Sequence, residues 1–134
     1  MIERLLIVLA FAALLTLGFR LLRRGQLARA VRIAPADPLL AALRPGVPAI
    51  LYFTTPACAP CRTRQRPAIQ RLLAELGDRV QVIEVNAAEQ LDAARRWGVL
   101  SVPTTFVLDG EGRPRAMNTG VAGLETLRGQ LRQL

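Results

Sequence analysis

Cys58 and Cys61 are the residues of this chain best suited to chemistry, and they are its only cysteines. Two residues, Ala59 and Pro60, separate them. A thiolate is a nucleophile, and a Cys-x-x-Cys setting lowers the thiol pKa to between about 3.5 and 7.5. A second thiol this close can attack a mixed disulfide and release a reduced product. The spacing therefore favours thiol–disulfide exchange.

The neighbouring sequence predicts that this pair lies where a strand turns into a helix. Residues 49–54 are an apolar, β-prone run, and Thr55-Pro56-Ala57 interrupts it. Apolar residues then recur at spacings of three and four, which predicts a helix from about 59 to 76. A helix N-terminus carries unpaired N–H groups and about half a positive charge, which favour a thiolate at Cys58. Pro60 suits the first turn, where no N–H is needed.

Two other interpretations of the cysteines remain open. A structural zinc site usually has four Cys or His ligands, and with no His in the chain such a site would have to be shared between two chains. An inert structural disulfide over a two-residue loop would constrain the unfolded chain little. We expect no metal and no other cofactor, so the redox-active group would be the Cys58–Cys61 disulfide itself.

The charge of the chain is concentrated near its N-terminus. All 18 basic residues are arginines, and the net charge is +8. Residues 1–32 hold six of these arginines and a single acid. The aromatic residues are few and fall mainly in apolar runs, so we see no basic-aromatic face for single strands and expect no nucleic-acid partner. Arginines that flank a membrane span explain the asymmetry better.

Residues 5–19 carry no charge at all. A membrane-spanning helix needs about 20 apolar residues. Residues 2–22 meet that length if Glu3, Arg4 and Arg20 reach the membrane interface, which is feasible near helix ends. This pattern predicts one transmembrane helix.

The chain then divides into an anchor at 2–24, a basic tether at 25–32 and a folded domain at 28–134. A cleaved signal peptide is the competing interpretation of the first segment. Its N-terminal region would carry little positive charge, and the small-x-small site Ala28-Arg29-Ala30 lies well past the apolar run. We therefore favour an uncleaved anchor that holds the protein at the membrane.

Arginine counting predicts the orientation of this anchor. One arginine precedes the apolar run, and the positive-inside rule places the arginine-rich side in the cytoplasm. A domain on the extracytoplasmic side stays open, because a single short anchor can disobey the rule. The arginines after the run are Arg20, Arg23, Arg24, Arg29 and Arg32.

The rest of the pattern predicts an α/β domain. Helices between strands imply parallel crossovers, and a tight turn at 109–112 implies an antiparallel pair, so we expect a mixed central sheet flanked by helices. Asp37 is expected to cap a short helix, with Pro38 at its first position. The expected strands are 28–33 at an edge, 49–54, 80–85, 104–108 and 115–119; the expected helices are 37–43, 59–76, 87–97 and 123–134.

Three motifs in residues 28–134 resemble the thioredoxin family. Cys58-Ala59-Pro60-Cys61 is similar to the family's active site, with Ala59 where thioredoxin usually has Gly. Trp97-Gly98-Val99-Leu100-Ser101-Val102-Pro103-Thr104 resembles the segment that holds the family's cis-proline, which would be Pro103. Thr119-Gly120 resembles the glycine site after the last strand. The resemblance implies a thioredoxin-like fold.

The resemblance also implies roles for individual residues. Cys58 would be the attacking thiolate, and Cys61 would be the resolving thiol. Pro103 would face the cysteines and leave the Val102 backbone free to pair with a substrate. The other residues expected to support substrate binding are Ala59, Pro60 and Thr104.

Two positions depart from the family pattern. Thioredoxins usually have a buried Asp six residues before the first Cys, where this chain has Tyr52, and a Trp just before that Cys, where it has Ala57. Glu84 aligns with the family's Lys near that Asp, and strand pairing would place it next to Tyr52. We therefore hypothesise that Glu84, with a pKa raised by burial, supplies the missing carboxylate of a proton relay. The alternative is that Glu84 points to solvent.

The expected function is that of a protein-disulfide oxidoreductase at the membrane. Ala59-Pro60 is close to the Gly-Pro of reducing thioredoxins, which favours a reductase. Its partners would be protein disulfide substrates and an unidentified electron donor reductase. Two alternatives remain: a non-catalytic binding module with the same fold, and an extracytoplasmic disulfide exchange protein.

Overall fold

A mixed sheet of four strands lies at the centre of the fold in the computed structural model, which describes residues 1–134. The strand order is β2-β1-β3-β4, with β1 and β2 parallel and the other neighbours antiparallel. This confirms the expected mixed sheet. The strands are β1 (Ala49–Thr54), β2 (Gln81–Asn86), β3 (Thr104–Leu108) and β4 (Pro114–Thr119), and the helices are α1 (Ile2–Ile33), α2 (Arg66–Leu76), α3 (Leu91–Arg96) and α4 (Leu124–Arg132).

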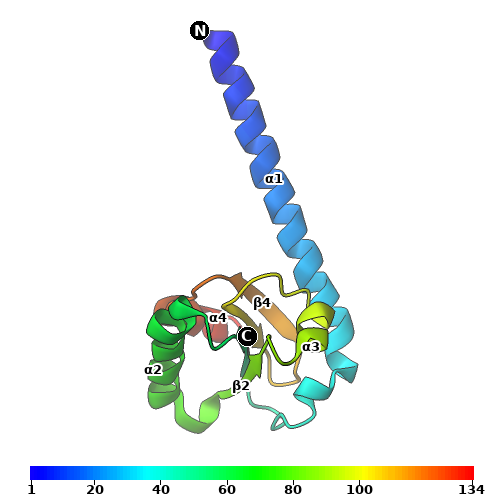
Figure 1. Cartoon of the computed structure of the whole chain (residues 1–134), viewed down its shortest axis with the longest axis vertical. Helices are drawn as coiled ribbons and strands as arrows, with labels where there is room; N and C mark the ends of the chain where they lie inside the picture. The colour runs from blue at the N-terminus through cyan, green and yellow to red at the C-terminus, as the bar shows by residue number, and fades with distance from the viewer.

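Helices cover both faces of the sheet (Figure 1). The helices α2 and α4 lie on one face, and the end of α1 lies with α3 on the other. Side chains alternate between faces along a strand. In β1, Leu51 and Phe53 join the core under α1 and α3, whereas Ile50 and Tyr52 join the core under α2 and α4. Two apolar cores therefore share one fully buried strand.

The edge strand expected at 28–33 is wrong, because this segment is the last part of α1. Four of its six residues are Ala or Arg, which are good helix formers, and neither Gly nor Pro occurs between residue 28 and Pro35, so the preceding helix continues through Val31 and Ile33. Ala30 and Ala34 are buried against the domain, in the cluster that contains Trp97. The predicted basic tether at 25–32 is therefore a helical extension whose end packs on the domain.

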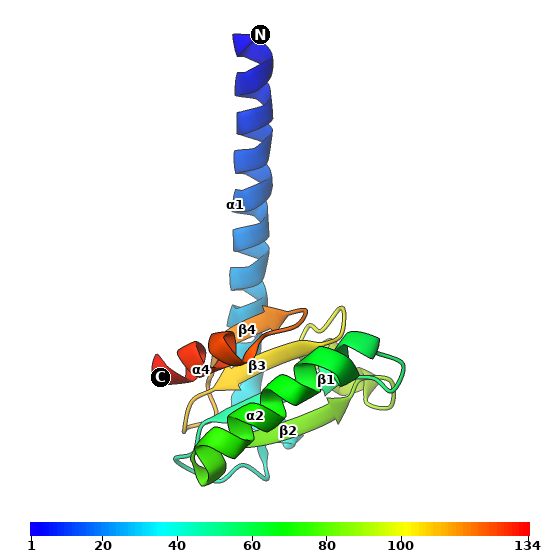
Figure 2. The ribbon, with the colours of Figure 1, turned by 90° about the vertical axis from the view of Figure 1, so that its left-hand side faces the viewer.

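The first two thirds of α1 stand away from the domain (Figure 2). Every side chain from residue 2 to residue 17 is exposed, although most are large and apolar. By length and composition this is the one helix that could cross a membrane, a property that signal sequences share.

Asp37 joins the segment after α1 to the end of α3. Its carboxylate accepts the Leu39 N–H, at 3.0 Å, as expected for a cap, although the helix it caps is a short 3₁₀ segment, Pro38–Leu40. It also accepts hydrogen bonds from Arg96 Nε, at 2.9 Å, and from Trp97 Nε1, at 3.0 Å. Only 1% of the Asp37 side chain is exposed, so these bonds hold a charge inside the domain.

The helix predicted at 87–97 is shorter than expected and occupies Leu91–Arg96. Asn86 explains the difference. Its side chain accepts the Ala88 N–H at 3.0 Å, and its backbone carbonyl accepts those of Glu89 and Gln90. An Asn that bonds to the backbone two residues on stabilises a turn instead of a helix. The turn at 109–112 and the helix before the C-terminus form as predicted.

Candidate active site

Cys58 and Cys61 are joined by a disulfide, with their Cα atoms 5.3 Å apart. They follow β1, a strand whose residues are all buried, and the turn in which the Cys58 N–H donates to the Thr55 carbonyl at 3.2 Å. Cys58 is 8% exposed and Cys61 is 1% exposed. Both cysteines are therefore largely buried, and Cys58 is the more exposed of the two.

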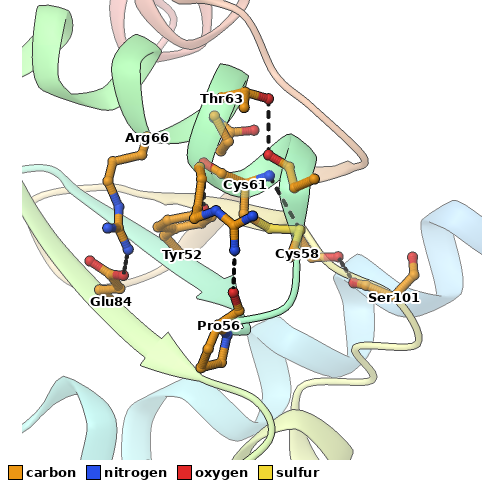
Figure 3. The surroundings of a disulfide bond; sticks show 12 residues. Tyr52, Pro56, Cys58, Cys61, Thr63, Arg66, Glu84 and Ser101 are labelled. Carbon is orange, nitrogen blue, oxygen red and sulfur yellow. Dashed lines mark hydrogen bonds and ion pairs between the residues drawn. A yellow bond between two sulfur atoms is a disulfide. The ribbon is translucent and has the colours of Figure 1, made fainter.

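A helix begins directly at the pair (Figure 3). The Cys61 N–H donates to Cys58 Sγ at 3.2 Å, so an N–H at the helix start faces this sulfur. A π-helical turn, Cys61–Gln65, precedes α2. Pro67 lies in the first turn of α2 and has no N–H to donate, which fits a change of helix type at this point. The predicted helix at 59–76 is thus present but not uniform.

The loop between α3 and β3 runs beside Cys58, as the position of Ser101 in Figure 3 shows. The peptide bond between Val102 and Pro103 is cis, which confirms the expectation for Pro103. The Pro103 carbonyl accepts the Gly120 N–H at 2.9 Å, so this loop and the one after β4 are bonded together. The Val102 side chain packs against the cluster that includes both cysteines, and its backbone makes no hydrogen bond within the chain. Free backbone groups therefore lie next to the disulfide.

The structure thus combines a disulfide at a helix start with a cis-proline loop beside it. The sequence model described as Thioredoxin matches residues 41–133. The chain belongs to the thioredoxin family. Among curated relatives, it is 37% identical over 60 residues to thioredoxin of Bacillus subtilis, covering 44% of this chain and 57% of the relative. It is 31% identical over 70 residues to thioredoxin 1 of Synechococcus elongatus, covering 52% of this chain and 64% of the relative.

Solved structures of the thioredoxin family share the fold. Thioredoxin O2 of Arabidopsis thaliana, in the oxidized state, is 26% identical, with a TM-score of 0.57 and coverage of 83% of this chain and 84% of that one. Mitochondrial thioredoxin 3 of Saccharomyces cerevisiae is 22% identical, with a TM-score of 0.56 and coverage of 65% and 78%. The sequence matches span 57% and 64% of the two curated thioredoxins, which is less than two thirds of the length of either.

In this thioredoxin-family protein, Tyr52 lies beneath Cys61. The side chain is buried, and its hydroxyl donates to the Cys61 carbonyl at 3.4 Å. Burial raises the pKa of Tyr52 above its usual value, and the negative charge of Glu84 acts in the same direction. The phenol therefore stays protonated near neutral pH and acts as a hydrogen-bond donor.

Glu84 pairs with Tyr52 in the β1–β2 register, as expected, and of the two interpretations of its side chain the structure supports the one in which it points to solvent. Its side chain is 49% exposed, and Oε1 lies 2.7 Å from Arg66 Nη2 on α2. The reason is topological, since β2 is an edge strand and α2 offers an arginine to the carboxylate. The buried carboxylate that the proton-relay hypothesis needed is absent from this position.

Gln65 is a buried polar residue that the sequence reasoning missed. It is 0% exposed, its Nε2 donates to the Ala122 carbonyl at 3.0 Å, and its Oε1 accepts the Ala122 N–H at 2.8 Å. These two bonds join the helix after the cysteines to the loop after β4. The available signal was its spacing, because Cys61, Gln65, Ile69 and Leu72 follow one helix face.

Proposed function

We propose that this thioredoxin-family protein is a thiol–disulfide oxidoreductase that reduces protein disulfides close to a membrane. The observation that carries the proposal is the Cys58–Cys61 disulfide at a helix start, 8% exposed at Cys58 and 1% at Cys61, beside the free backbone of Val102. This geometry supports an extended client segment that pairs with Val102 and brings its disulfide to Cys58.

The proposed reaction has two exchange steps. The Cys58 thiolate attacks one sulfur of the client disulfide, and the other client sulfur leaves as a thiolate. The Cys61 thiolate then attacks Cys58 Sγ, closes the Cys58–Cys61 disulfide and releases the second client thiolate. The client gains two electrons, the cysteine pair loses two, and solvent supplies the protons. A separate reductase must return two electrons before the next cycle.

Local contacts support the assignment of these two roles. The Cys61 N–H faces Cys58 Sγ at 3.2 Å and would stabilise a negative charge on it. Cys61 lies deeper, against Tyr52, where a client could not reach it first. The remaining positions proposed to contact the client are Ala59, Pro60, Pro103 and Thr104.

The proposed anchor is α1, with the domain on the cytoplasmic side. Residues 2–22 as a helix are about 30 Å long, which matches the hydrocarbon thickness of a bilayer. Five of the six arginines in residues 1–32 lie at or beyond the domain end of the apolar run and only Arg4 lies before it, as the positive-inside rule requires for a cytoplasmic domain. Labelling Cys58 in reduced whole cells with a membrane-impermeant thiol reagent tests the orientation, and rapid labelling would place the domain outside.

Reduction of a soluble insulin-type disulfide, with dithiothreitol as recycler, tests the activity. Wild type should be active, and Cys58→Ser should be inactive. Cys61→Ser should accumulate a mixed disulfide with the client, because no resolving thiol remains. Inactive wild type would instead favour a binding module with the same fold, and activity that survives Cys58→Ser would overturn the assigned nucleophile.

Alkylation of the reduced protein at neutral pH provides a second test. Cys58 should be modified first, because it is the more exposed thiol and the one that faces the Cys61 N–H. Mass spectrometry of the digested protein measures each site separately. Equal rates at both cysteines would contradict the assigned roles.

A further inference from the structure

The helix α1 continues without a break from its exposed apolar part into the domain. Its end is held by packing against the domain and by a hydrogen bond. Ala30 and Ala34 are buried in the core with Trp97, and the Arg29 guanidinium donates to the Arg95 carbonyl at 3.1 Å. Because the packed part and the exposed part are one helix, the domain cannot swing freely about the end of the apolar segment.

The strand β4 meets α1 directly after the apolar segment. Arg23, Arg24 and Leu27 of α1 line one small cavity together with Met117 and Thr119 of β4. At 1.5 Å per residue, Arg23 lies about 6 Å beyond Phe19 along the helix axis. A lipid headgroup layer is about 5–8 Å thick on each side of the hydrocarbon. If residues 2–22 span a bilayer, the end of β4 lies at the level of the headgroups.

The sheet then fixes the height of the redox site. Figure 2 shows β4 on the side from which α1 leaves the domain, with β2 on the far side. Thr119 pairs with Thr104 of β3, and Thr104 pairs with Phe53 of β1, which leads to the cysteines. Neighbouring strands are about 4.8 Å apart, so the chain enters the active-site turn about 10 Å beyond β4.

The loop 98–103, which carries the cis-proline, also rises on the α1 side (Figures 1 and 2). Leu100 in this loop is 88% exposed, the highest exposure of any large apolar side chain in the domain. A single exposed leucine is common on protein surfaces, so Leu100 is compatible with this placement of the domain but does not by itself establish it.

We propose that α1 holds the redox site at a fixed height above the bilayer, so that its clients are disulfides within about 10–15 Å of the lipid headgroups. The proposal rests on the proposed oxidoreductase function and restricts its substrate class. Disulfides in the first residues after a transmembrane segment of another protein lie in this zone. Disulfides in distant soluble domains do not, although a freely diffusing soluble disulfide can still reach the site.

A series of membrane-anchored clients, called the ladder below, tests the height of the redox site above the bilayer, because each client carries its disulfide at a different distance from the lipid. Full-length protein is reconstituted in vesicles of phosphatidylcholine and phosphatidylglycerol with transmembrane peptides that continue as a helical Glu-Ala-Ala-Ala-Lys spacer and end in a disulfide loop. Each repeat raises the disulfide by about 7 Å. Wild type should reduce the one-repeat client fastest, and the six-repeat client, about 45 Å away, at least tenfold more slowly. Equal rates along the ladder would overturn the proposal.

Two insertions of equal length after Leu22 distinguish the effect of a rigid connection between anchor and domain from the effect of a longer one. A helical insertion of seven residues lifts the domain by about 10 Å and nearly keeps its rotation, so the preferred client should move up by one to two repeats. A flexible insertion of seven Gly and Ser residues should instead make the reduction rates of the clients depend much less on spacer length. The same profile for both insertions would overturn the rigid placement. Both should reduce the soluble disulfide at the wild-type rate; loss of that activity in wild type would instead refute the oxidoreductase function.

A measurement without catalysis tests the placement itself. In a Cys58→Ser, Cys61→Ser background, a fluorophore is attached at Thr119→Cys or at Asp78→Cys, two exposed positions near opposite edges of the sheet. Lipids with nitroxide-labelled headgroups should quench the label at 119 strongly and the label at 78 weakly. Equal quenching at both positions would overturn the proposal even if the enzyme were inactive.

Discussion

One face of the sheet buries a carboxylate, and the other buries two sulfurs, a phenol and an amide. Under α1 and α3, Asp37 is surrounded by donors from Leu39, Arg96 and Trp97. Under α2 and α4, the Cys58–Cys61 disulfide lies with Tyr52 and Gln65, and none of these groups carries a charge in this oxidised form. The polar bonds on the face under α1 and α3 hold distant parts of the chain together. The face under α2 and α4 instead keeps Cys58 available for exchange.

This difference shows where the fold tolerates a buried charge. A buried carboxylate is stable only when donors and a positive charge surround it, as they do for Asp37. No such set lies beneath Cys61, where the hydroxyl of Tyr52 satisfies a backbone carbonyl instead. We therefore expect changes on the first face to affect stability, and changes on the second to affect both stability and exchange.

Deletions should have the largest effect. Removing residues 1–24 leaves Ala30 and Ala34 in place, so the shortened protein should be soluble, folded and active on a soluble disulfide. Removing residues 1–34 opens the core around Trp97 to water and should lower the free energy of unfolding by more than about 3 kcal/mol. Urea unfolding followed by Trp97 fluorescence measures both. Aggregation of the shorter deletion would mean that the apolar segment belongs to the domain core.

Asp37→Asn should have the next largest effect, a loss of about 3 kcal/mol of unfolding free energy at pH 7. Burial alone would raise the pKa of Asp37, but bonds from Arg96 and Leu39 and the Arg96 charge outweigh it, so the pKa is lowered. Its stabilisation is therefore complete above the unfolded pKa, about 3.9, and is lost as pH falls through the folded value. The difference between the variant and wild type should shrink from pH 5 to pH 2.5.

The control for this carboxylate is Asp78→Asn, because the Asp78 side chain is fully exposed. Its unfolding free energy should stay within about 0.5 kcal/mol of wild type at every pH. A difference for Asp37→Asn that does not depend on pH would show that the negative charge is not what stabilises this face.

On the redox face, Gln65→Leu should cost about 2–3 kcal/mol, because it leaves the Ala122 N–H and carbonyl without partners. Gln70→Leu, on the exposed side of the same helix, is the matched control and should change stability by less than about 0.5 kcal/mol. Disulfide reduction should slow only in the Gln65 variant, since the loop after β4 bonds to Pro103. Equal effects of both substitutions would contradict the role of Gln65.

The smallest effects are expected at Tyr52 and Glu84. Tyr52→Phe removes one long hydrogen bond and should cost about 1 kcal/mol. Glu84→Gln breaks a half-exposed ion pair, worth about 0–1 kcal/mol, and should leave the pH–rate profile of disulfide reduction unchanged. A shift of that profile in Glu84→Gln would restore the proton-relay hypothesis, in spite of the ion pair with Arg66.

The sequence alone determined the family, the cysteine pair and most strands, because these depend on local signals. The run at 49–54 became β1 without change, since a nearly continuous apolar run of six residues, four of them β-branched or aromatic, suits a strand buried on both faces. Cys58-Ala59-Pro60-Cys61 and the segment around Pro103 are motifs whose residue types and spacing are visible without coordinates. The cap at Asp37 was also local, because its carboxylate reaches an N–H only two residues away.

The tertiary structure decided what depends on residues far apart in the chain. Residues 28–33 are helical because the preceding helix extends into them and Ala30 is buried in the cluster that contains Trp97, an arrangement that no short window of sequence contains. Glu84 is half-exposed because β2 has no outer neighbour and Arg66 lies across from it. Gln65 is buried because Ala122, on a distant loop, offers both a donor and an acceptor to its amide. A polar side chain can be buried only where such partners converge, and that convergence is a property of the fold.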